Sequence, residues 1–259
     1  MPAPTNRFKA ALKAGKMQYG CWAGFADAYA TEMLATAEFD WLVVDGEHAP
    51  NDLQTLSAQI GVLQHEHSEA VVRLPVGNEW LVKQVLDAGA QTLLIPLVET
   101  ADQAHEMVRA MLYPPTGIRG SGAALARASR FSAIPDYVAT ANDQMCLLVQ
   151  VETVKGMENL DDILTVEGVD GVFIGPSDLA ADMGFLGNSS APEVAEAIQR
   201  GLARIAASDK AAGILAVDNK VAQTYAEWGA QFLAVGIDVL MLVKTARETM
   251  ALWKSRDTT

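Results

Sequence analysis

Short apolar runs alternate with amphipathic stretches from one end of the chain to the other. Most of these runs are continuously apolar, which is typical of strands in a parallel sheet that is buried on both faces. Eight of them are predicted to be strands, at residues 18–25, 39–44, 70–74, 91–96, 145–151, 170–174, 212–217 and 232–235.

The stretches between the strands have helical patterns, and several begin with a residue that can cap a helix. The expected caps are Asn51 or Asp52 for a helix to about residue 67, Asn78 for 79–88, Thr100 for 101–111, and Ser190 for a long helix that passes Pro192. Two further helices are predicted at 220–228 and 240–253. Strand–helix alternation repeated eight times implies parallel pairing with right-handed crossovers. The expected fold is therefore α/β, a single (β/α)8 TIM barrel over residues 1–259, with a doubly wound open sheet as the alternative.

Two connections are unusually long, at residues 113–144 and 175–190. Both are expected to follow strands and to lie at the C-terminal face of the barrel, where long loops tend to be functional. No stretch has the composition of a linker, so a second domain is not expected.

The composition is that of a folded globular protein, with 50% hydrophobic and 20% charged residues. The formal net charge of −13 argues against a nucleic-acid or membrane partner. It does not exclude a small anionic substrate that meets a local Arg or a metal. Because Cys21 and Cys146 are the two cysteines, no disulfide framework is expected, and a reducing cytoplasm is the simplest location. The N-terminal segment lacks the apolar core of a signal peptide, and no apolar run approaches the roughly 18 residues of a membrane span.

Polar residues stand where several predicted strands end, which is where a TIM barrel carries its active site. Glu152 and Asp178 follow neighbouring strands at matching depth, and this pair suits a hard divalent cation such as Mg²⁺ or Mn²⁺. Gln150 lies two residues before Glu152 and therefore shares its face of the strand. The alternative for each carboxylate is a purely structural role, and Asp178 in particular could cap the following helix.

Two basic residues stand near strand ends. His48 closes the polar run Asp45-Gly46-Glu47-His48 after the second strand, and Arg73 lies inside the third strand. An Arg in an apolar strand is costly unless it is paired, which favours a site role, although a structural carboxylate could be its partner. His48 could equally be an ordinary loop histidine.

The absence of several motifs excludes certain cofactors and reaction types. The chain has no dinucleotide fingerprint and no P-loop, so no nucleotide cofactor is expected. None of the lysines lies in the apolar strand-end setting that a Schiff-base lysine needs, so a lysine-dependent aldolase is not expected.

At this point the residues match a known family. The chain resembles the HpcH/HpaI family of metal-dependent class II pyruvate aldolases over nearly its whole length. The resemblance is carried by FDWLVVDGEHAPND (39–52), VVRLPVGNEWLVKQVLDAGAQTLLIPLVET (71–100), YPPTGIRGSGAALARASRF (113–131), LLVQVETVKGMENLDDIL (147–164) and GVDGVFIGPSDLA (168–180).

The resemblance implies a role for each matching residue. Glu152 and Asp178 are expected to bind the metal, His48 to be the catalytic base, Asp87 to raise the basicity of His48, and Arg73 to stabilise an enolate oxygen. Further substrate contacts are implied for Gln150, Ser177, Asp178, Trp22 and Leu215. Ser177 departs from the Ala that is frequent in the family, which puts substrate preference in doubt.

The activity implied is reversible addition of pyruvate, hydroxypyruvate or a related 2-oxo acid to an aldehyde, with Mg²⁺, Mn²⁺ or Co²⁺. The resemblance also implies a homohexamer, a trimer of dimers, with the C-terminal helix at 240–253 exchanged between subunits. An acyl-CoA lyase of the malyl-CoA or citramalyl-CoA type is one alternative, but it needs a basic phosphate site, and the Arg-rich stretch at 119–130 is the sole candidate. A non-catalytic barrel that binds 2-oxo acids is the other, and it would not need His48, Asp87 and Arg73 together.

Overall fold

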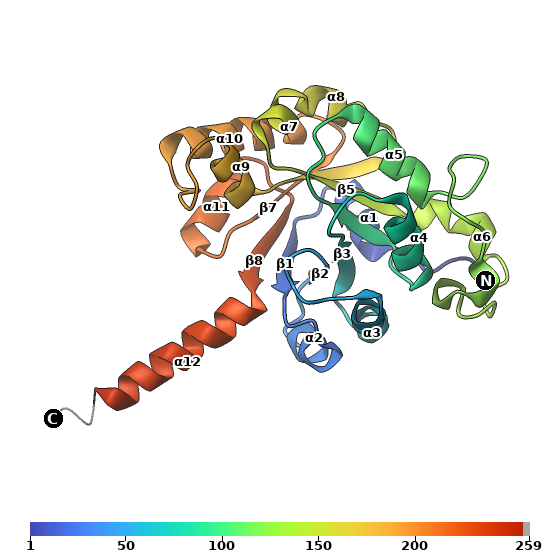
Figure 1. The fold of residues 1–259 in the computed structure, drawn as a ribbon, viewed down its shortest axis with the longest axis horizontal. Helices are drawn as coiled ribbons and strands as arrows, with labels where there is room; N and C mark the ends of the chain where they lie inside the picture. Colours follow the sequence, from blue (N-terminus) through green and yellow to red (C-terminus); the bar gives the residue numbers. More distant parts are fainter. Residues whose placement is uncertain (256–259) are drawn as a thin grey trace.

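Eight parallel strands close into a barrel in the computed structural model, which describes residues 1–255 (Figure 1). Each strand pairs with the next in the sequence, and the last pairs with the first. The strands are β1 (Gln18–Ala23), β2 (Trp41–Asp45), β3 (Glu69–Arg73), β4 (Thr92–Ile95), β5 (Cys146–Val151), β6 (Val169–Ile174), β7 (Ala211–Leu215) and β8 (Phe232–Ile237). All eight predicted strands and the barrel itself are thereby confirmed, with strand ends within two residues of the expected positions.

Helices follow the strands, and all except the last, α12, surround the barrel and lead the chain back toward the start of the next strand. They are α2 (Ala28–Ala35), α3 (Leu53–Leu63), α4 (Glu79–Asp87), α5 (Ala101–Met111), α7 (Val154–Glu158), α8 (Leu160–Leu164), α10 (Pro192–Ala206), α11 (Asn219–Glu227) and α12 (Asp238–Lys254). The remaining helical segments are α1 (Arg7–Lys13), α6 (Tyr137–Thr140), α9 (Pro176–Asp182) and the 3-10 turns η1 (Ala123–Leu125), η2 (Arg127–Ser129) and η3 (Asn142–Gln144). Sequence patterns did not predict α1, α2, α6, α7 or α8, and they indicated α9 only as a helix that Asp178 could cap.

The caps decide where several helices begin. Asp52, Asn78 and Thr100 accept backbone N–H groups of α3, α4 and α5, as predicted. The prediction for Ser190 is wrong, because Ala191 is the cap position of α10 and the Ser190 hydroxyl donates to Asn188 instead. Helix α3 ends at Leu63 rather than near residue 67, since the polar residues that follow turn the chain into β3.

Five aromatic rings fill the barrel interior. Phe8 from α1 packs against Trp41 and Phe232 at the N-terminal end, with ring centroids 5.7 and 5.8 Å apart. Trp22 and Phe173 pack at a tilt nearer the C-terminal end, with ring centroids 5.5 Å apart. A side chain at Gly213 would overlap the Phe232 ring, so this glycine leaves room for the aromatic core. The interior is therefore packed, and any cavity has to lie above the Trp22–Phe173 layer.

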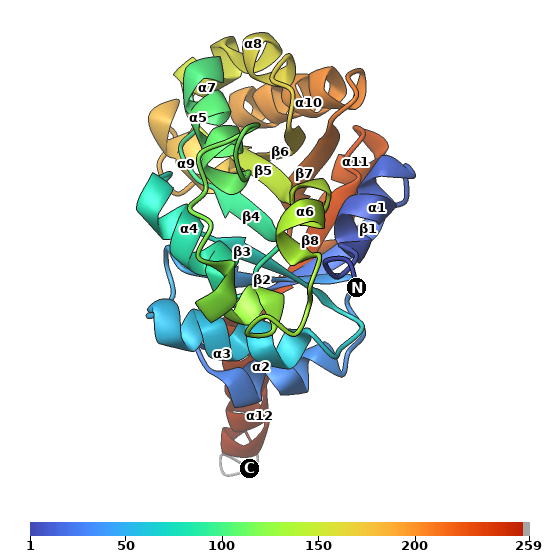
Figure 2. The ribbon, with the colours of Figure 1, turned by 90° about the vertical axis from the view of Figure 1, so that its right-hand side faces the viewer.

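The long connection at residues 113–144 lies at the opposite end of the barrel from the predicted one. It follows helix α5 and leads into β5, so it belongs to the N-terminal face. The N-terminal segment packs against it, because Ala3 N donates to Thr140 and Asn6 N donates to Gln144 (Figure 2). The connection at 175–190 follows β6 and is at the C-terminal face as expected.

Helix α12 leaves the barrel after β8 and projects away from it (Figures 1 and 2). Its sequence is rich in large apolar side chains that are exposed in the single chain: Leu240, Met241, Leu242, Val243, Met250, Leu252 and Trp253. No helix within residues 1–255 is both long and apolar enough to cross a membrane.

Candidate active site

A cavity of about 400 Å³ opens at the C-terminal mouth of the barrel. It brings together seven of the predicted site residues, which lie on β1, β3, β5 and β7 or in the segments that follow β2 and β6: Trp22, His48, Arg73, Gln150, Ser177, Asp178 and Leu215. Alternation along each strand explains the set, because every second residue faces the interior. On β2, Trp41 and Val43 lie in the inner core, and Asp45 is on the same face at the C-terminal end of the strand.

Arg73 is buried, with 7% of its side chain exposed, and two carboxylates surround its guanidinium group. Its Nε and Nη2 donate to Asp45 at 2.8 and 2.6 Å, and its Nη1 lies 2.7 Å from Glu47 Oε2. The guanidinium carbon also lies 5.2 Å from the centre of the Trp22 ring. These contacts fix the cation at the floor of the cavity.

Asp45 and Glu47 both contact Arg73, and sequence reasoning assigned neither to the site, although both stand in the polar run before His48. Burial alone would raise the pKa of Asp45, but hydrogen bonds and charge from Arg73 outweigh it and lower the pKa below its usual value. Burial raises the pKa of Glu47, and Arg73 opposes that rise only in part. The sequence signal that could have found them is the pair of acids at the end of the second strand, with Arg73 in the next strand.

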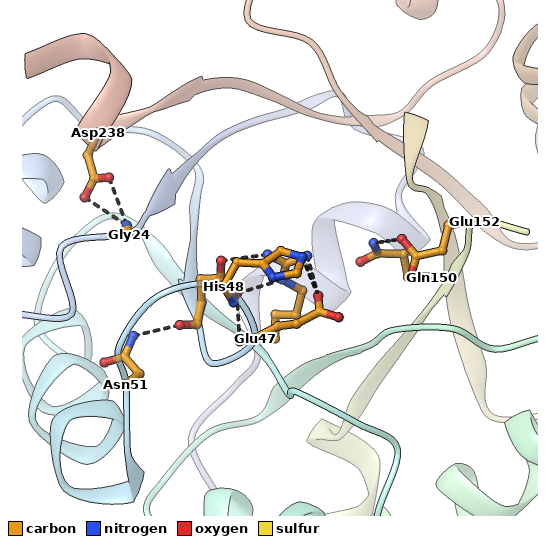
Figure 3. A network of polar contacts seen from close by, with 9 residues as sticks. Gly24, Glu47, His48, Asn51, Gln150, Glu152 and Asp238 are labelled. Atoms are coloured by element: carbon orange, nitrogen blue, oxygen red, sulfur yellow. Dashed lines mark hydrogen bonds and ion pairs between the residues drawn. The ribbon is translucent and has the colours of Figure 1, made fainter. Parts of the chain in front are cut away.

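The loop between β2 and α3 carries His48. Asp45 Oδ1 accepts the backbone N–H groups of Glu47 and His48, at 3.0 and 3.4 Å. The imidazole is 67% exposed, and its Nε2 lies 3.7 Å from Glu47 Oε2 (Figure 3). Its position is thus set by the loop backbone more than by packing of the ring.

Glu152 and Gln150 lie together on the opposite side of the mouth (Figure 3). Gln150 Nε2 donates to Glu152 Oε2, and Leu97 N donates to Glu152 Oε1 at 2.9 Å. Burial raises the pKa of Glu152 to about 7, with smaller contributions from the charges of Asp178 and Glu47. Gln150 Oε1 is buried and has no hydrogen-bond partner among the described residues.

Asp178 lies in the first turn of α9, where Pro176 is the first residue and Gly175 is the cap position. Its carboxylate makes no capping bond in the described structure, so the structural alternative for this residue is not realised. The turn passes so close to Glu152 that a side chain at Gly175 would overlap the Glu152 carboxylate. This close approach carries Asp178 toward the same end of the cavity.

The polar groups on this side of the mouth fit a divalent cation. Asp178 and Gln150 line the cavity, and Glu152 lies beside Gln150 and Gly175. Their two carboxylates and the unpartnered amide oxygen Gln150 Oε1 are the hard oxygen donors that Mg²⁺ and Mn²⁺ prefer. Within residues 1–255 no cluster of three or more His, Cys, Asp or Glu side chains is arranged to hold a metal. The protein would therefore supply two carboxylates and leave other positions to water and substrate, as is common for Mg²⁺.

The structure does not bring Asp87 to His48 within one chain, contrary to the expectation from the family resemblance. Asp87 is the last residue of α4, and a helix that follows a barrel strand ends at the N-terminal face. There its carboxylate forms an ion pair with Arg119 at 2.8 Å. The guanidinium carbon of Arg119 lies over the Tyr113 ring, 4.5 Å from the ring centre. The carboxylate beside His48 is Glu47, with Asp45 holding the backbone of the loop.

The chain is similar along its length to proteins of known name. The chain is 68% identical over 257 residues to a hydroxypyruvate/pyruvate aldolase of Roseovarius nubinhibens, with 99% of this chain and 100% of that protein covered. It is 53% identical over 253 residues to a 4-hydroxy-2-oxo-heptane-1,7-dioate aldolase of Escherichia coli, with 98% and 97% covered.

A solved structure from Burkholderia cenocepacia J2315, described as an HpcH/HpaI aldolase/citrate lyase family protein, superposes with a TM-score of 0.92 at 40% identity and covers 97% of this chain and 100% of that one. Aldolases are carbon–carbon lyases, and the two curated relatives bear that name. The family model for HpcH/HpaI aldolase/citrate lyase matches residues 18–245, and the chain therefore belongs to this family.

Proposed function

We propose that this protein is a class II aldolase that joins pyruvate or hydroxypyruvate to an aldehyde, reversibly and with a divalent metal. The observation that carries the proposal is the shared cavity of about 400 Å³, which a buried Arg, an exposed His and the Asp178 carboxylate line. Glu152 lies beside it, hydrogen-bonded to the lining residue Gln150. The names of the curated relatives support the choice of 2-oxo acid.

Glu152 and Asp178 would hold the metal, which we expect to be Mg²⁺, Mn²⁺ or Co²⁺. When bound, it acts as a Lewis acid toward the oxygens of the 2-oxo acid. Gln150 fixes the orientation of the Glu152 carboxylate by donating to it, and its own amide oxygen is buried without a partner among the described residues.

Arg73 stabilises the negative charge that develops on the C2 oxygen when the enolate forms. Asp45 and Glu47 occupy one hydrogen on each guanidinium nitrogen, and this leaves one hydrogen each on Nη1 and Nη2 for the substrate. Because the group is already fixed, little reorganisation is needed at the moment of reaction.

His48 moves the proton. In the direction of synthesis it removes a proton from C3 of the 2-oxo acid, either directly or through water, and in cleavage it takes the proton of the 4-hydroxyl group. The aldehyde then adds to C3 or leaves from it. Trp22, Leu215 and Ser177 line the rest of the cavity and would set which side chains fit.

The alternative acyl-CoA lyase activity is not favoured. The Arg119 side chain is completely buried and paired with Asp87, and Arg127 donates to Ala88 O and Gln64. These arginines lie at the N-terminal face and are committed to the protein, so they do not form a phosphate site near the cavity. A non-catalytic barrel would have no use for a proton-transfer group beside the buried Arg.

We further propose that the chain forms a homohexamer, a trimer of dimers, in which α12 is exchanged between subunits. The projecting helix and its exposed apolar side chains support this, because large apolar patches on single chains mark interfaces. A cytoplasmic location is proposed on the two free, buried cysteines.

The test of the proposed function is a panel of aldehydes with pyruvate and with hydroxypyruvate. Product formation should stop in EDTA and return when Mn²⁺, Mg²⁺ or Co²⁺ is added in excess. Undiminished turnover after thorough chelation would exclude the metal-dependent reaction. Product from neither 2-oxo acid with any aldehyde would exclude the substrate class.

A further inference from the structure

The loop that carries His48 is closed by a side chain. Asn51 Nδ2 donates to the backbone carbonyl of Asp45 at 2.8 Å, so the two ends of the loop are joined directly (Figure 3). Asp45 is also the residue whose carboxylate accepts the backbone N–H groups of Glu47 and His48. Both the carboxylate and the backbone carbonyl of Asp45 thus accept hydrogen bonds from the loop.

A buried amide holds Asn51 in this orientation. Gln59 Nε2 donates to Asn51 Oδ1 at 2.7 Å and to Thr55 O at 3.0 Å, while Gln59 Oε1 accepts from the Thr31 hydroxyl at 3.0 Å. Gln59 is completely buried and Thr31 is 2% exposed. A buried amide whose partners are removed is costly, so this arrangement has one favoured geometry.

Helix capping does not explain the role of Asn51. Helix α3 begins with a complete capping box, in which Asp52 accepts from Gln54 N and Thr55 N while the Thr55 hydroxyl accepts from Asp52 N. The helix start is therefore satisfied without Asn51. Its Nδ2 group donates to the loop, and its Oδ1 accepts from Gln59 rather than from the backbone at the helix start.

We propose that Asn51 is a positioning residue for His48, and that Gln59 acts through it. The imidazole is 67% exposed, so the loop backbone, rather than packing, has to aim the ring at the substrate. Without the Asn51–Asp45 contact the loop loses its closing hydrogen bond, and His48 samples positions from which it cannot reach C3. This inference rests on the proposed role of His48 as the base.

The experiment compares Asn51→Ala, Gln59→Met and the double variant in the Mn²⁺-loaded enzyme. Exchange of the pyruvate methyl protons with solvent deuterium and the kcat of aldol cleavage should both fall by about 10- to 100-fold in Asn51→Ala, because small misplacements of a catalytic group are costly. The KM for pyruvate should stay within about twofold, since Arg73, Glu152 and Asp178 keep their contacts.

The coupling between the two substitutions distinguishes a positioning role from a merely structural one. Gln59→Met should slow exchange, and the double variant should be no slower than Asn51→Ala, because both changes act on one contact. The matched control is Asn159→Ala, which removes an equivalent bond at 2.8 Å from an Asn amide to the backbone carbonyl of Glu99. It should keep exchange within about twofold of the wild type.

The outcomes separate the positioning role from the proposed function. If His48→Ala exchanges as fast as the wild type, the assignment of the base fails, and the positioning role fails with it. If His48→Ala abolishes exchange while Asn51→Ala keeps the wild-type rate, only the positioning role is overturned. Two other results would also overturn the positioning role. One is a lowered Tm in Asn51→Ala together with an exchange rate that recovers on cooling. The other is a double variant whose loss of exchange rate is the product of the two single losses.

Discussion

Arg73 and Asp45 are direct neighbours across β2 and β3, where their Cα atoms are partners in the strand register, and their side chains form two hydrogen bonds of 2.8 and 2.6 Å. Both side chains are nearly buried, at 7% and 5% exposed. An Arg in a barrel strand is therefore balanced by a carboxylate at the same level of the next strand. The pair fixes the position of the guanidinium before any substrate arrives.

Removing Arg73 should cost stability as well as activity. Arg73→Ala leaves Asp45 buried with no cation, and breaking a buried pair in this way typically costs about 3–5 kcal/mol. The free energy of unfolding in urea measures the loss. Arg73→Ala combined with Asp45→Asn should recover part of that stability but none of the activity. A single variant as stable as the wild type would contradict the buried pair.

Metal binding should stabilise the fold through the two carboxylates. A ligand at 100 times its Kd adds about 2.7 kcal/mol to the folded state, so the Tm should rise with Mn²⁺ in the wild type. Glu152→Gln removes one charged ligand and should show almost no rise. Glu158→Gln, at an exposed site on α7, is the matched control and should behave as the wild type. An equal rise in the Tm of Glu152→Gln would show that the metal binds elsewhere.

Both thiols should be inert in the native protein. Burial raises the pKa of Cys21 to about 12 and raises the pKa of Cys146 well above its usual value. The thiolate is the reactive form, so alkylation should be negligible between pH 7 and 9 and should become detectable only as the pH approaches the raised pKa. Iodoacetamide followed by mass measurement should add two groups per chain in urea and none in buffer. Rapid labelling of the folded protein would contradict the burial.

The exposed apolar side chains of α12 should determine the oligomeric state. Light scattering should give the wild type the mass of a hexamer, because a projecting apolar helix needs a partner surface. Leu242→Glu with Leu252→Glu should lower the mass, whereas Lys244→Glu on the same helix should not. A monomeric wild type would contradict helix exchange.

The barrel could be predicted from sequence because a parallel strand buried on both faces leaves a continuous apolar run, and eight such runs stand in order. The cavity residues followed from the rule that strand ends carry the site, and Arg73 and Asp178 do line the cavity at the mouth, with Glu152 hydrogen-bonded to the lining residue Gln150. The same rule was misapplied to residues 113–144, since that segment follows a helix rather than a strand.

Side-chain partners were harder to predict than positions. Asp87 was expected beside His48, yet local sequence does not show that Asp87 ends a helix at the far face and meets Arg119. Asp45 was visible as a strand-end acid, but its pairing with Arg73 depends on the register between two strands 28 residues apart. The contact of Gln59 with Asn51 likewise depends on how α3 packs back on the loop, which no short pattern encodes.

The central claim is that His48 exchanges a proton with C3 of a 2-oxo acid held at the barrel mouth. Its most direct test is the appearance of deuterium in the methyl group of pyruvate in D₂O, followed by NMR with no aldehyde present. Wild-type protein with Mn²⁺ should exchange these protons, and His48→Ala or EDTA should slow the exchange by at least about 100-fold. Exchange that continues at the wild-type rate in His48→Ala would contradict the account.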